Sequence, residues 1–137
     1  MSTRSFIAIK VPGGYMGIYS HWDGYPQKPG VGWQLKRSYT TTDKVKKLIA
    51  LGDISSLKSN IGRKHDFDKP SQSTTAYHRD RGEAWSQVKP KLAQNLQVLM
   101  QIADRMGCEW VYVWENGRWN TYEVPTHSGG VFGVTLV

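Results

Sequence analysis

The feature that most constrains the fold is the pair Asn116-Gly117, set between two segments rich in β-branched and aromatic residues. Such a pair favours a two-residue turn with positive φ angles, which joins antiparallel strands in a tight hairpin. The register that this turn predicts sets three pairs opposite one another: Trp114 and Trp119, Tyr112 and Thr121, Trp110 and Glu123. The other face of the hairpin would carry Val111, Val113, Tyr122 and Val124.

A second hairpin is expected near the N-terminus. Residues 6–11 alternate between two faces, and Pro12-Gly13-Gly14 then turns the chain into residues 15–19. With Gly13-Gly14 as a two-residue loop, the facing pairs of one apolar face would be Val11 with Met16 and Ile9 with Ile18. The opposite face would carry Lys10, Tyr19 and His21.

Three helices are predicted between the hairpins. A short helix begins near Gly32 and ends at about Ser38, and a second begins with Thr42 as its N-cap and ends before Gly52. The third begins at Pro90 and ends at Gly107, because apolar residues recur between them at helical spacing. These residues are Leu92, Leu96, Leu99, Ala103 and Met106.

Together these elements predict a single α+β domain over residues 1–137. The sheet would be antiparallel, built from the N-terminal and C-terminal hairpins, with two or three helices packed mainly on one face. Residues 131–137 are expected to add a last strand. Residues 58–82 are polar and aperiodic and are expected to form a long loop, which in a compact domain is usually functional, mobile or an unrecognised element.

The formal net charge of +7 is unevenly distributed. Residues 1–91 hold 16 of the 18 basic side chains, whereas residues 92–137 hold two basic and four acidic ones. This excess favours anionic partners, although charge also keeps a small protein soluble. The single cysteine, Cys108, is expected to be buried, and we find no apolar signal core or membrane span. We therefore expect a cytoplasmic protein with no membrane partner.

The densest chemistry lies in residues 20–26, Ser-His-Trp-Asp-Gly-Tyr-Pro, called here the His21 tract. It follows a predicted strand, and such junctions commonly carry binding and catalytic groups. His21 could act as an acid or base, and Asp23 could orient it or bind a ribose or a metal. Trp22 and Tyr25 would form aromatic walls. The alternative is a tight turn at Asp23-Gly24 with the aromatic residues in the core; we favour a site.

Two further tracts carry basic groups. Gly30-Val31-Gly32 precedes the short helix that bears Lys36 and Arg37, where a phosphate could bind, although an ordinary turn is favoured. Residues 77–83, Tyr-His-Arg-Asp-Arg-Gly-Glu, are called here the His78 tract. Its Arg79 and Arg81 could clamp a phosphate, with His78 beside them. A self-compensating charge cluster is an equal alternative, because Asp80 and Glu83 lie alongside.

Neither a metal nor a cofactor is assigned from the sequence. The histidines and nearby aspartates supply possible ligands, but in no recognised spacing. The tryptophans and tyrosines of the C-terminal hairpin could stack on bases, yet cross-strand packing is favoured, and the acidic character of residues 92–137 argues against nucleic acid there. The flat hairpin is also compatible with a homodimer interface.

Three segments carry a resemblance: residues 18–26, residues 48–57 and the His78 tract. Together they resemble small proteins encoded by bacteriophages and prophages, and residues 18–26 are the most specific. The resemblance covers roughly the first two thirds of the chain. It implies a phage accessory role in the host cytoplasm and assigns no catalytic residue. Ser20 stands where cysteine is expected in many relatives.

Three functions follow as hypotheses. The first is a phage accessory binding protein that captures an anionic ligand, a nucleotide or second messenger, or a host defence protein. Its ligand-binding residues would be His21, Trp22, Asp23, Tyr25, Lys36, Arg37, His78, Arg79 and Arg81. The second is an enzyme acting on a phosphodiester or nucleotide-linked ribose, with His21, Asp23 and His78 as candidates. The third is a DNA- or RNA-binding protein.

Overall fold

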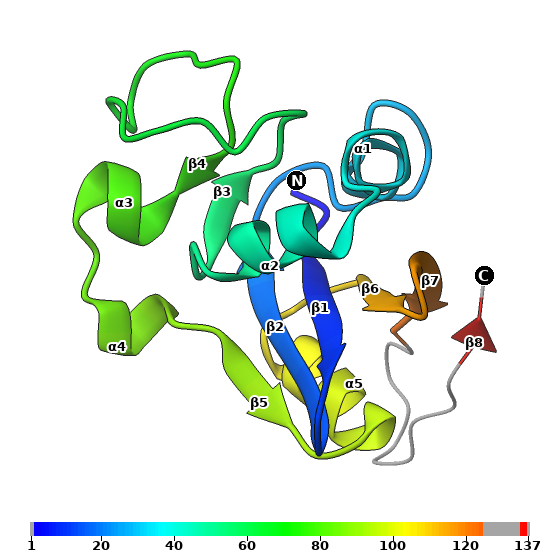
Figure 1. The fold of residues 1–137 in the computed structure, drawn as a ribbon. Coiled ribbons are helices and arrows are strands. Elements are labelled where there is room, and N and C mark those ends of the chain that lie inside the picture. The colour runs from blue at the N-terminus through cyan, green and yellow to red at the C-terminus, as the bar shows by residue number, and fades with distance from the viewer. Residues whose placement is uncertain (1, 125–134, 137) are drawn as a thin grey trace.

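The computed structural model describes residues 2–124 and 135–136. Its helices and strands follow one another in the order shown in Figure 1. They are β1 (Ser5–Val11), β2 (Gly14–Ser20), α1 (Val31–Ser38), α2 (Thr42–Ile49), β3 (Ile54–Ser56), β4 (Thr75–Ala76), α3 (Tyr77–Arg81), α4 (Trp85–Val88), β5 (Lys91–Ala93), α5 (Leu96–Arg105), β6 (Trp110–Glu115), β7 (Arg118–Glu123) and β8 (Thr135–Leu136).

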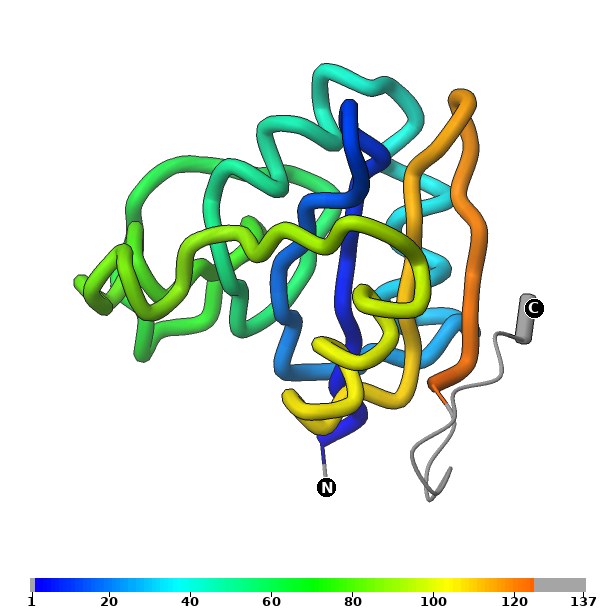
Figure 2. Tube along the Cα trace, turned by 90° about the horizontal axis from the view of Figure 1, so that it is seen from below, coloured from blue at the N-terminus to red at the C-terminus, as the bar shows by residue number. Residues whose placement is uncertain are grey.

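The strands form one sheet in the order β4-β3-β2-β1-β6-β7-β8, and β5 pairs with β2 beside this path. The α+β class is therefore confirmed, but the sheet is mixed rather than antiparallel throughout. The two hairpins join through their first strands, and β1 and β6 run parallel from Ser5 opposite Trp110 to Ile9 opposite Trp114. Figure 2 shows β1, β6 and β7 side by side. The long connection through α5 returns the chain in the direction of β1, which makes this pair parallel.

The C-terminal hairpin has the predicted register. Trp114 pairs with Trp119, Tyr112 with Thr121 and Trp110 with Glu123. Asn116 and Gly117 have φ angles of 56° and 75°, as a turn of this kind requires. The last predicted strand is present at Thr135–Leu136, which pairs with β7, and the rest of 131–137 lies outside the described residues.

The predicted register of the N-terminal hairpin is wrong by two residues. Its turn is Pro12-Gly13, so that Val11 pairs with Gly14, Ile9 with Met16 and Ile7 with Ile18. Proline favours the first turn position, and Gly13 has the positive φ of 83° that the second requires. A shift of two residues preserves the faces, so the predicted apolar face remains correct.

Both faces of the sheet are covered by helices, which corrects the expectation of packing mainly on one face. Ile7, Ile9 and Ile18 pack with α1 and α2, while Phe6 and Ala8 on the other face pack with α5. In Figure 1, α2 lies in front of β1 and β2, and α5 lies behind them. The central strands are buried on both faces, as is usual where a sheet includes parallel pairs.

The helix predicted from Pro90 begins later. Residues 91–93 instead form β5, which pairs with Tyr15–Gly17 of β2. The helix starts after Asn95, whose side-chain oxygen accepts a hydrogen bond of 2.8 Å from the Val98 N–H. Leu92, placed on the helical face by its spacing, is 68% exposed in β5. Residues 91–93 therefore pair with the free edge of β2 instead of forming the first turn of the predicted helix.

We expect Asn95→Ala to lower the free energy of unfolding by about 1 kcal/mol, because it leaves N–H groups of the first turn without an acceptor. Chemical denaturation measures this change, and Gln94→Ala, an exposed neighbour outside the cap, is the matched control. Equal stability of Asn95→Ala and the wild type would contradict the assigned start of α5.

The remaining elements need two smaller corrections. Thr41 rather than Thr42 caps α2, through a 3.3 Å bond from the Lys44 N–H to its hydroxyl. The expected loop 58–82 contains β4 and α3 at its end. The loop proper is thus residues 57–74, and a bridge between Asn60 and Ser73 closes its middle part.

Candidate functional site

The His21 tract continues the sheet beyond β2. The N–H groups of His21 and Trp22 donate to the carbonyls of Ile54 and Ser55 at 3.2 and 3.1 Å, so the tract is aligned along β3. The chain then turns at Asp23, which has a φ angle of 55°, and the Gly24 N–H donates to Thr3 at 2.8 Å. The tract is therefore fixed by backbone bonds on both sides of the turn.

His21 supports the neighbouring indole of Trp22. Its Nδ1 lies 2.7 Å from the Tyr19 hydroxyl, and its ring meets Trp22 edge-on with centroids 4.6 Å apart. Burial, followed by the nearby Arg4 charge, lowers the pKa of His21, and burial raises the pKa of Tyr19 to about 12. At neutral pH the phenol is therefore protonated and the imidazole neutral, and the two groups share one hydrogen bond. This chain of contacts holds Trp22 in place.

Asp23 and Tyr25 belong to the turn. The Asp23 carbonyl accepts from the Val31 N–H at 2.7 Å, and its carboxylate lies 3.5 Å from the Tyr25 hydroxyl. The buried Tyr112 hydroxyl donates to the Gly24 carbonyl at 2.6 Å. A Cβ on Gly32 would lie 2.9 Å from the oxygen of Tyr112, so this glycine permits a close approach of helix and sheet.

The basic residues of α1 lie elsewhere. Lys36 and Arg37 are exposed, and the Arg37 guanidinium covers the ring of Trp33 at 5.2 Å. Lys36 lines a different groove, beside Arg118 and Trp119. The structure thus does not bring these two cations to the His21 tract.

The guanidinium N–H groups of Arg79 all donate hydrogen bonds within the protein. Its Nε and Nη2 donate to both oxygens of Asp80, Nη2 also donates to Thr74, and Nη1 donates to the carbonyls of Ile61 and Gly62. These five acceptors match the five N–H donors of a guanidinium group. Arg79 therefore fastens the loop 57–74 to α3, and its donors are occupied.

The other members of the His78 tract are also engaged. Arg81 pairs with Glu83 at 2.6 Å and stacks on the rings of Phe67 and Tyr77 at 4.5 and 4.9 Å. His78 contacts the Glu83 carbonyl at 2.8 Å and the ring of Trp85. The alternative of a self-compensating charge cluster thus describes most of this tract.

The two tracts lie on either side of β3. The His21 tract pairs with its carbonyls at Ile54 and Ser55, and the Tyr77 N–H donates to the Asp53 carbonyl at 3.2 Å. Both tracts contact β3 or its preceding residue, but His21 and His78 have different contact partners. The side chains that this arrangement does bring together are those of Trp22 and of the loop 57–74.

A groove of about 290 Å³ lies between Trp22 and the loop 57–74, and it is called here the Trp22 groove. Trp22, 47% exposed, forms one wall, and the loop 57–74 forms another. The lining residues are Trp22, Ser55, Ser56, Lys58, Phe67, Lys69, Pro70, Ser71 and Thr75. Of these, only Trp22 was among the candidate residues predicted from the sequence. The polar loop 58–82 was the one signal that pointed to the others, because residues 58–75 hold most of them.

The Trp22 groove combines aromatic, hydroxyl and cationic groups. Lys58 and Lys69 are exposed, and neither forms an ion pair within the part of the chain that the structure describes. Their charges are thus available to an anion, and the indole face of Trp22 is available for stacking. Among the residues that the structure describes, no carboxylate lines the groove. The arrangement suits a small ligand that has both a flat apolar part and a negative charge.

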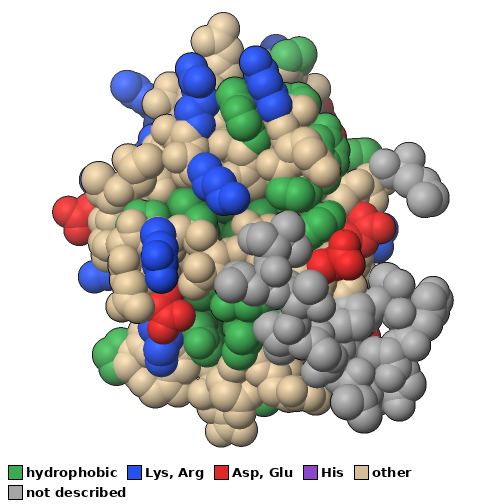
Figure 3. Space-filling view, turned by 90° about the vertical axis from the view of Figure 1, so that its right-hand side faces the viewer, with side chains coloured by type: hydrophobic (Ala, Val, Ile, Leu, Met, Phe, Trp, Pro, Cys, Tyr) green, Lys and Arg blue, Asp and Glu red, His purple; other side chains and the backbone are tan. Residues whose placement is uncertain are grey.

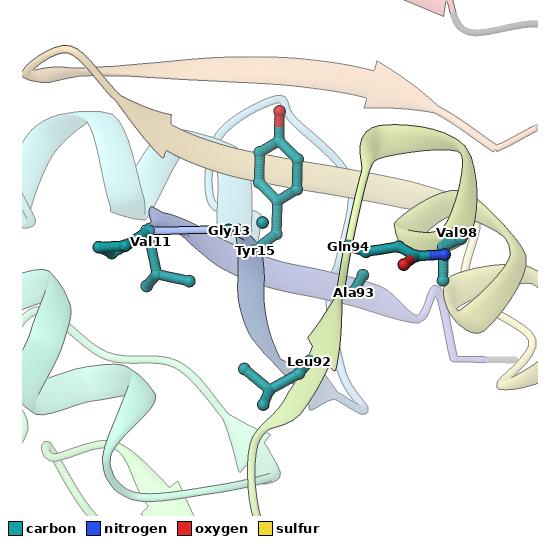
Figure 4. Close-up of a pocket in the computed structure, with 9 residues that line it drawn as sticks. Val11, Gly13, Tyr15, Leu92, Ala93, Gln94 and Val98 are labelled. Atoms are coloured by element: carbon teal, nitrogen blue, oxygen red, sulfur yellow. The ribbon is translucent and has the colours of Figure 1, made fainter.

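A second, apolar pocket of about 390 Å³ lies at the tip of the N-terminal hairpin (Figure 4). It is formed by the Pro12-Gly13 turn, β5 and the start of α5, and the exposed Leu92 lies on its rim. It has no charged residue among its described lining residues and lies at the other end of β2 from the His21 tract. The described lining of this pocket therefore offers no cation to an anionic ligand.

Metal and thiol chemistry have little basis in the described residues. Within residues 2–124 and 135–136, no three His, Cys, Asp or Glu side chains are grouped so that they could hold a metal ion. Cys108 is buried as predicted, at 3% exposure, and burial raises its pKa to about 12. No helix of the described chain is long and apolar enough to cross a membrane.

Searches of protein-family models, curated proteins and solved structures each gave no match to this chain.

Proposed function

We propose that this protein binds a small anionic ligand of nucleotide size in the Trp22 groove. The observation that carries the proposal is that one groove places an exposed indole beside two lysines that form no ion pair with any described residue. Stacking of a base on Trp22 and charge-assisted bonds from Lys58 and Lys69 to a phosphate would use both kinds of group. A volume of about 290 Å³ lies at the lower limit for ligand pockets and suits one nucleotide unit.

Capture, rather than turnover, is the activity that this arrangement favours. A catalytic acid or base must reach the reacting group, but neither His21 nor His78 lines the groove. His21 supports Trp22, and His78 is bound to the Glu83 carbonyl. In a phage-encoded protein, as the resemblance implies, capture of a nucleotide second messenger would lower its free concentration in the host. That biological role is part of the proposal.

The proposal predicts that AMP binds more tightly than adenosine, which lacks the phosphate, and than ribose 5-phosphate, which lacks the base. Trp22→Ala should weaken AMP binding about tenfold or more, because stacking contributes about 1–3 kcal/mol per base. The same change should leave ribose 5-phosphate binding nearly unchanged. Isothermal titration calorimetry measures all three ligands, and Trp85→Ala, a similarly exposed indole outside the groove, is the control.

The contribution of positive charge is tested with the double variant Lys58→Ala with Lys69→Ala. We expect this pair to weaken AMP and ribose 5-phosphate binding at least about tenfold, since each hydrogen bond between charged groups contributes about 1.5–3 kcal/mol. Lys64→Ala, an exposed lysine of the same loop that does not line the groove, should have little effect. Equal losses in Lys64→Ala would contradict the site, and consumption of AMP during the titration would replace capture by catalysis.

A further inference from the structure

A second surface lies around the turn of the C-terminal hairpin, far in the chain from the Trp22 groove. Two shallow grooves of about 570 and 300 Å³ meet there, and both are lined by Trp114 and Gly117. We call them together the hairpin trough. Its polar and aromatic lining residues are Lys10, Thr42, Lys46, Glu115 and Asn116 on one side of the turn, and Lys36, Thr40, Arg118 and Trp119 on the other.

The hairpin trough is strongly basic. Lys46 lies on one side of the turn and Lys36 and Arg118 on the other, and Glu115 is the single acidic residue among the described lining residues. Lys10 also lines the trough, but its ammonium lies over the ring of Tyr15, 5.1 Å from the centroid. Among the described residues none of these four cations forms an ion pair. Figure 3, which views the molecule from the side of β7, shows Lys and Arg side chains spread among hydrophobic ones over the upper and left parts of this face.

The aromatic floor of the trough is held in a fixed position. The indole N–H of Trp114 donates to the Thr42 hydroxyl at 3.0 Å, and that of Trp119 donates to the Tyr39 carbonyl at 2.9 Å. The two rings meet edge to face with centroids 5.3 Å apart. Trp119 remains partly exposed. A fixed, partly exposed indole in a groove that is also lined by Lys36 and Arg118 combines the aromatic and cationic groups with which proteins bind single strands.

The tertiary structure reverses an argument made from the sequence. Residues 92–137 are acidic overall, which argued against nucleic acid at this hairpin. Lys36 of α1 and Lys46 of α2, however, are brought beside the hairpin by the packing of both helices against its Trp114 and Trp119 face. Segments distant in the chain therefore supply the positive charge that the hairpin itself lacks.

We infer that the hairpin trough binds the backbone of a single-stranded nucleic acid, with a base stacked on Trp119. An acidic peptide would satisfy the cations but would leave the indole without a flat partner. This site is separate from the Trp22 groove and does not depend on the function proposed for that groove.

The test is fluorescence anisotropy of a labelled oligothymidylate of about 12 nucleotides, a length within the range that small single-strand sites cover. Binding should weaken steeply between about 50 and 200 mM salt. Lys36→Glu with Arg118→Glu should weaken it at least about tenfold. The loss of two phosphate contacts should also reduce the slope of log affinity against log salt by about 1.4.

The matched control is Lys58→Glu with Lys69→Glu, which makes the same change of net charge in the Trp22 groove. Retention of oligothymidylate binding in this control supports the trough, whereas an equal loss in both double variants overturns it, because only net charge would then matter. Competition by polyglutamate as strong as by unlabelled oligothymidylate also overturns it in favour of an acidic polypeptide. No binding at about 50 mM salt overturns it outright. The AMP titrations report on the other groove, so the two proposals fail separately.

Discussion

Asp80→Ala is expected to lower the free energy of unfolding by about 3–5 kcal/mol, the largest effect of any substitution considered for this protein. The Asp80 side chain is fully buried and accepts bonds from the Ala76 N–H at 2.7 Å, the His65 N–H at 3.1 Å and the Arg79 guanidinium. Its removal leaves the largely buried Arg79 without its carboxylate and two backbone N–H groups without an acceptor. Urea denaturation measures the change.

The matched control for this prediction is Glu83→Ala, which removes the carboxylate of the exposed pair with Arg81. Exposed pairs contribute about 0–1 kcal/mol, so this variant should be nearly as stable as the wild type. Similar losses in the two variants would contradict the structural role of the Arg79–Asp80 pair. Because that pair fastens the loop carrying Lys58, Phe67 and Lys69, Asp80→Ala should also weaken AMP binding.

Acid should reduce the contribution of Asp80 to the free energy of unfolding. Burial alone would raise the pKa of Asp80, but the bonds from Arg79, Ala76 and His65 outweigh it and hold the pKa below its usual value. The stability that Asp80 contributes is therefore fully present above the unfolded-state pKa of about 3.9 and is lost as pH falls through the lower folded-state value. The deficit of Asp80→Asn relative to the wild type should thus shrink in strong acid.

Asp53→Ala is the second substitution with a large expected effect, about 1–3 kcal/mol. Along the edge of β2, β5 pairs only with Tyr15–Gly17 and β3 only with Ser20, which leaves a break between them. The buried Asp53 carboxylate closes this break, because it accepts the Tyr19 N–H at 2.9 Å and lies 3.6 Å from the Lys91 ammonium. Alanine would leave the Tyr19 N–H without that acceptor.

Asp53→Asn separates the hydrogen bond from the charge. The amide oxygen can still accept the Tyr19 N–H, so we expect a smaller loss at neutral pH than for alanine. Burial raises the pKa of Asp53, although the Tyr19 N–H and Lys91 lower it in part. The cost of burying the charged form is therefore present above the folded-state pKa and disappears as pH falls below the unfolded-state value.

The stability difference from the wild type should therefore change with pH in opposite directions for the two asparagine variants. Relative to the wild type, the stability of Asp53→Asn should be closer to wild type at pH 7 than near about pH 3, whereas the deficit of Asp80→Asn should be larger at pH 7 than near about pH 3. Denaturation curves of both variants and of the wild type at both pH values decide this. Parallel trends for the two variants would contradict the environments assigned to the two carboxylates.

Local sequence predicted those parts of the fold that depend on near neighbours. Asn116-Gly117 determined the register of β6 and β7, because a two-residue turn leaves no freedom in the pairing that follows. Pro12-Gly13-Gly14 predicted a hairpin but not its register, since two glycines offered two turns of similar quality. The pattern after Pro90 failed at its first turn, where pairing with β2 was available to residues 91–93.

The candidate site depended on contacts that sequence distance hides. The His21 tract was singled out as dense in chemistry, yet His21 contacts Tyr19 and Trp22 and does not line the groove. The arginine that looked best suited to a phosphate, Arg79, is saturated by Asp80 and loop carbonyls. The cations of the groove that form no ion pair with a described residue are instead Lys58 and Lys69, whose neighbours in sequence gave them no distinguishing pattern.

The sequence by itself determined a basic α+β chain with two hairpins, their apolar faces, and one wall of the groove, because turn chemistry and side-chain alternation act within a few residues. Only the tertiary structure decided that β1 and β6 run parallel and that helices cover both faces. It alone set Lys58 beside Trp22, and Lys36 beside Trp119. These decisions depend on the burial of both sheet faces and on saturation of hydrogen bonds between distant segments, which no local pattern encodes.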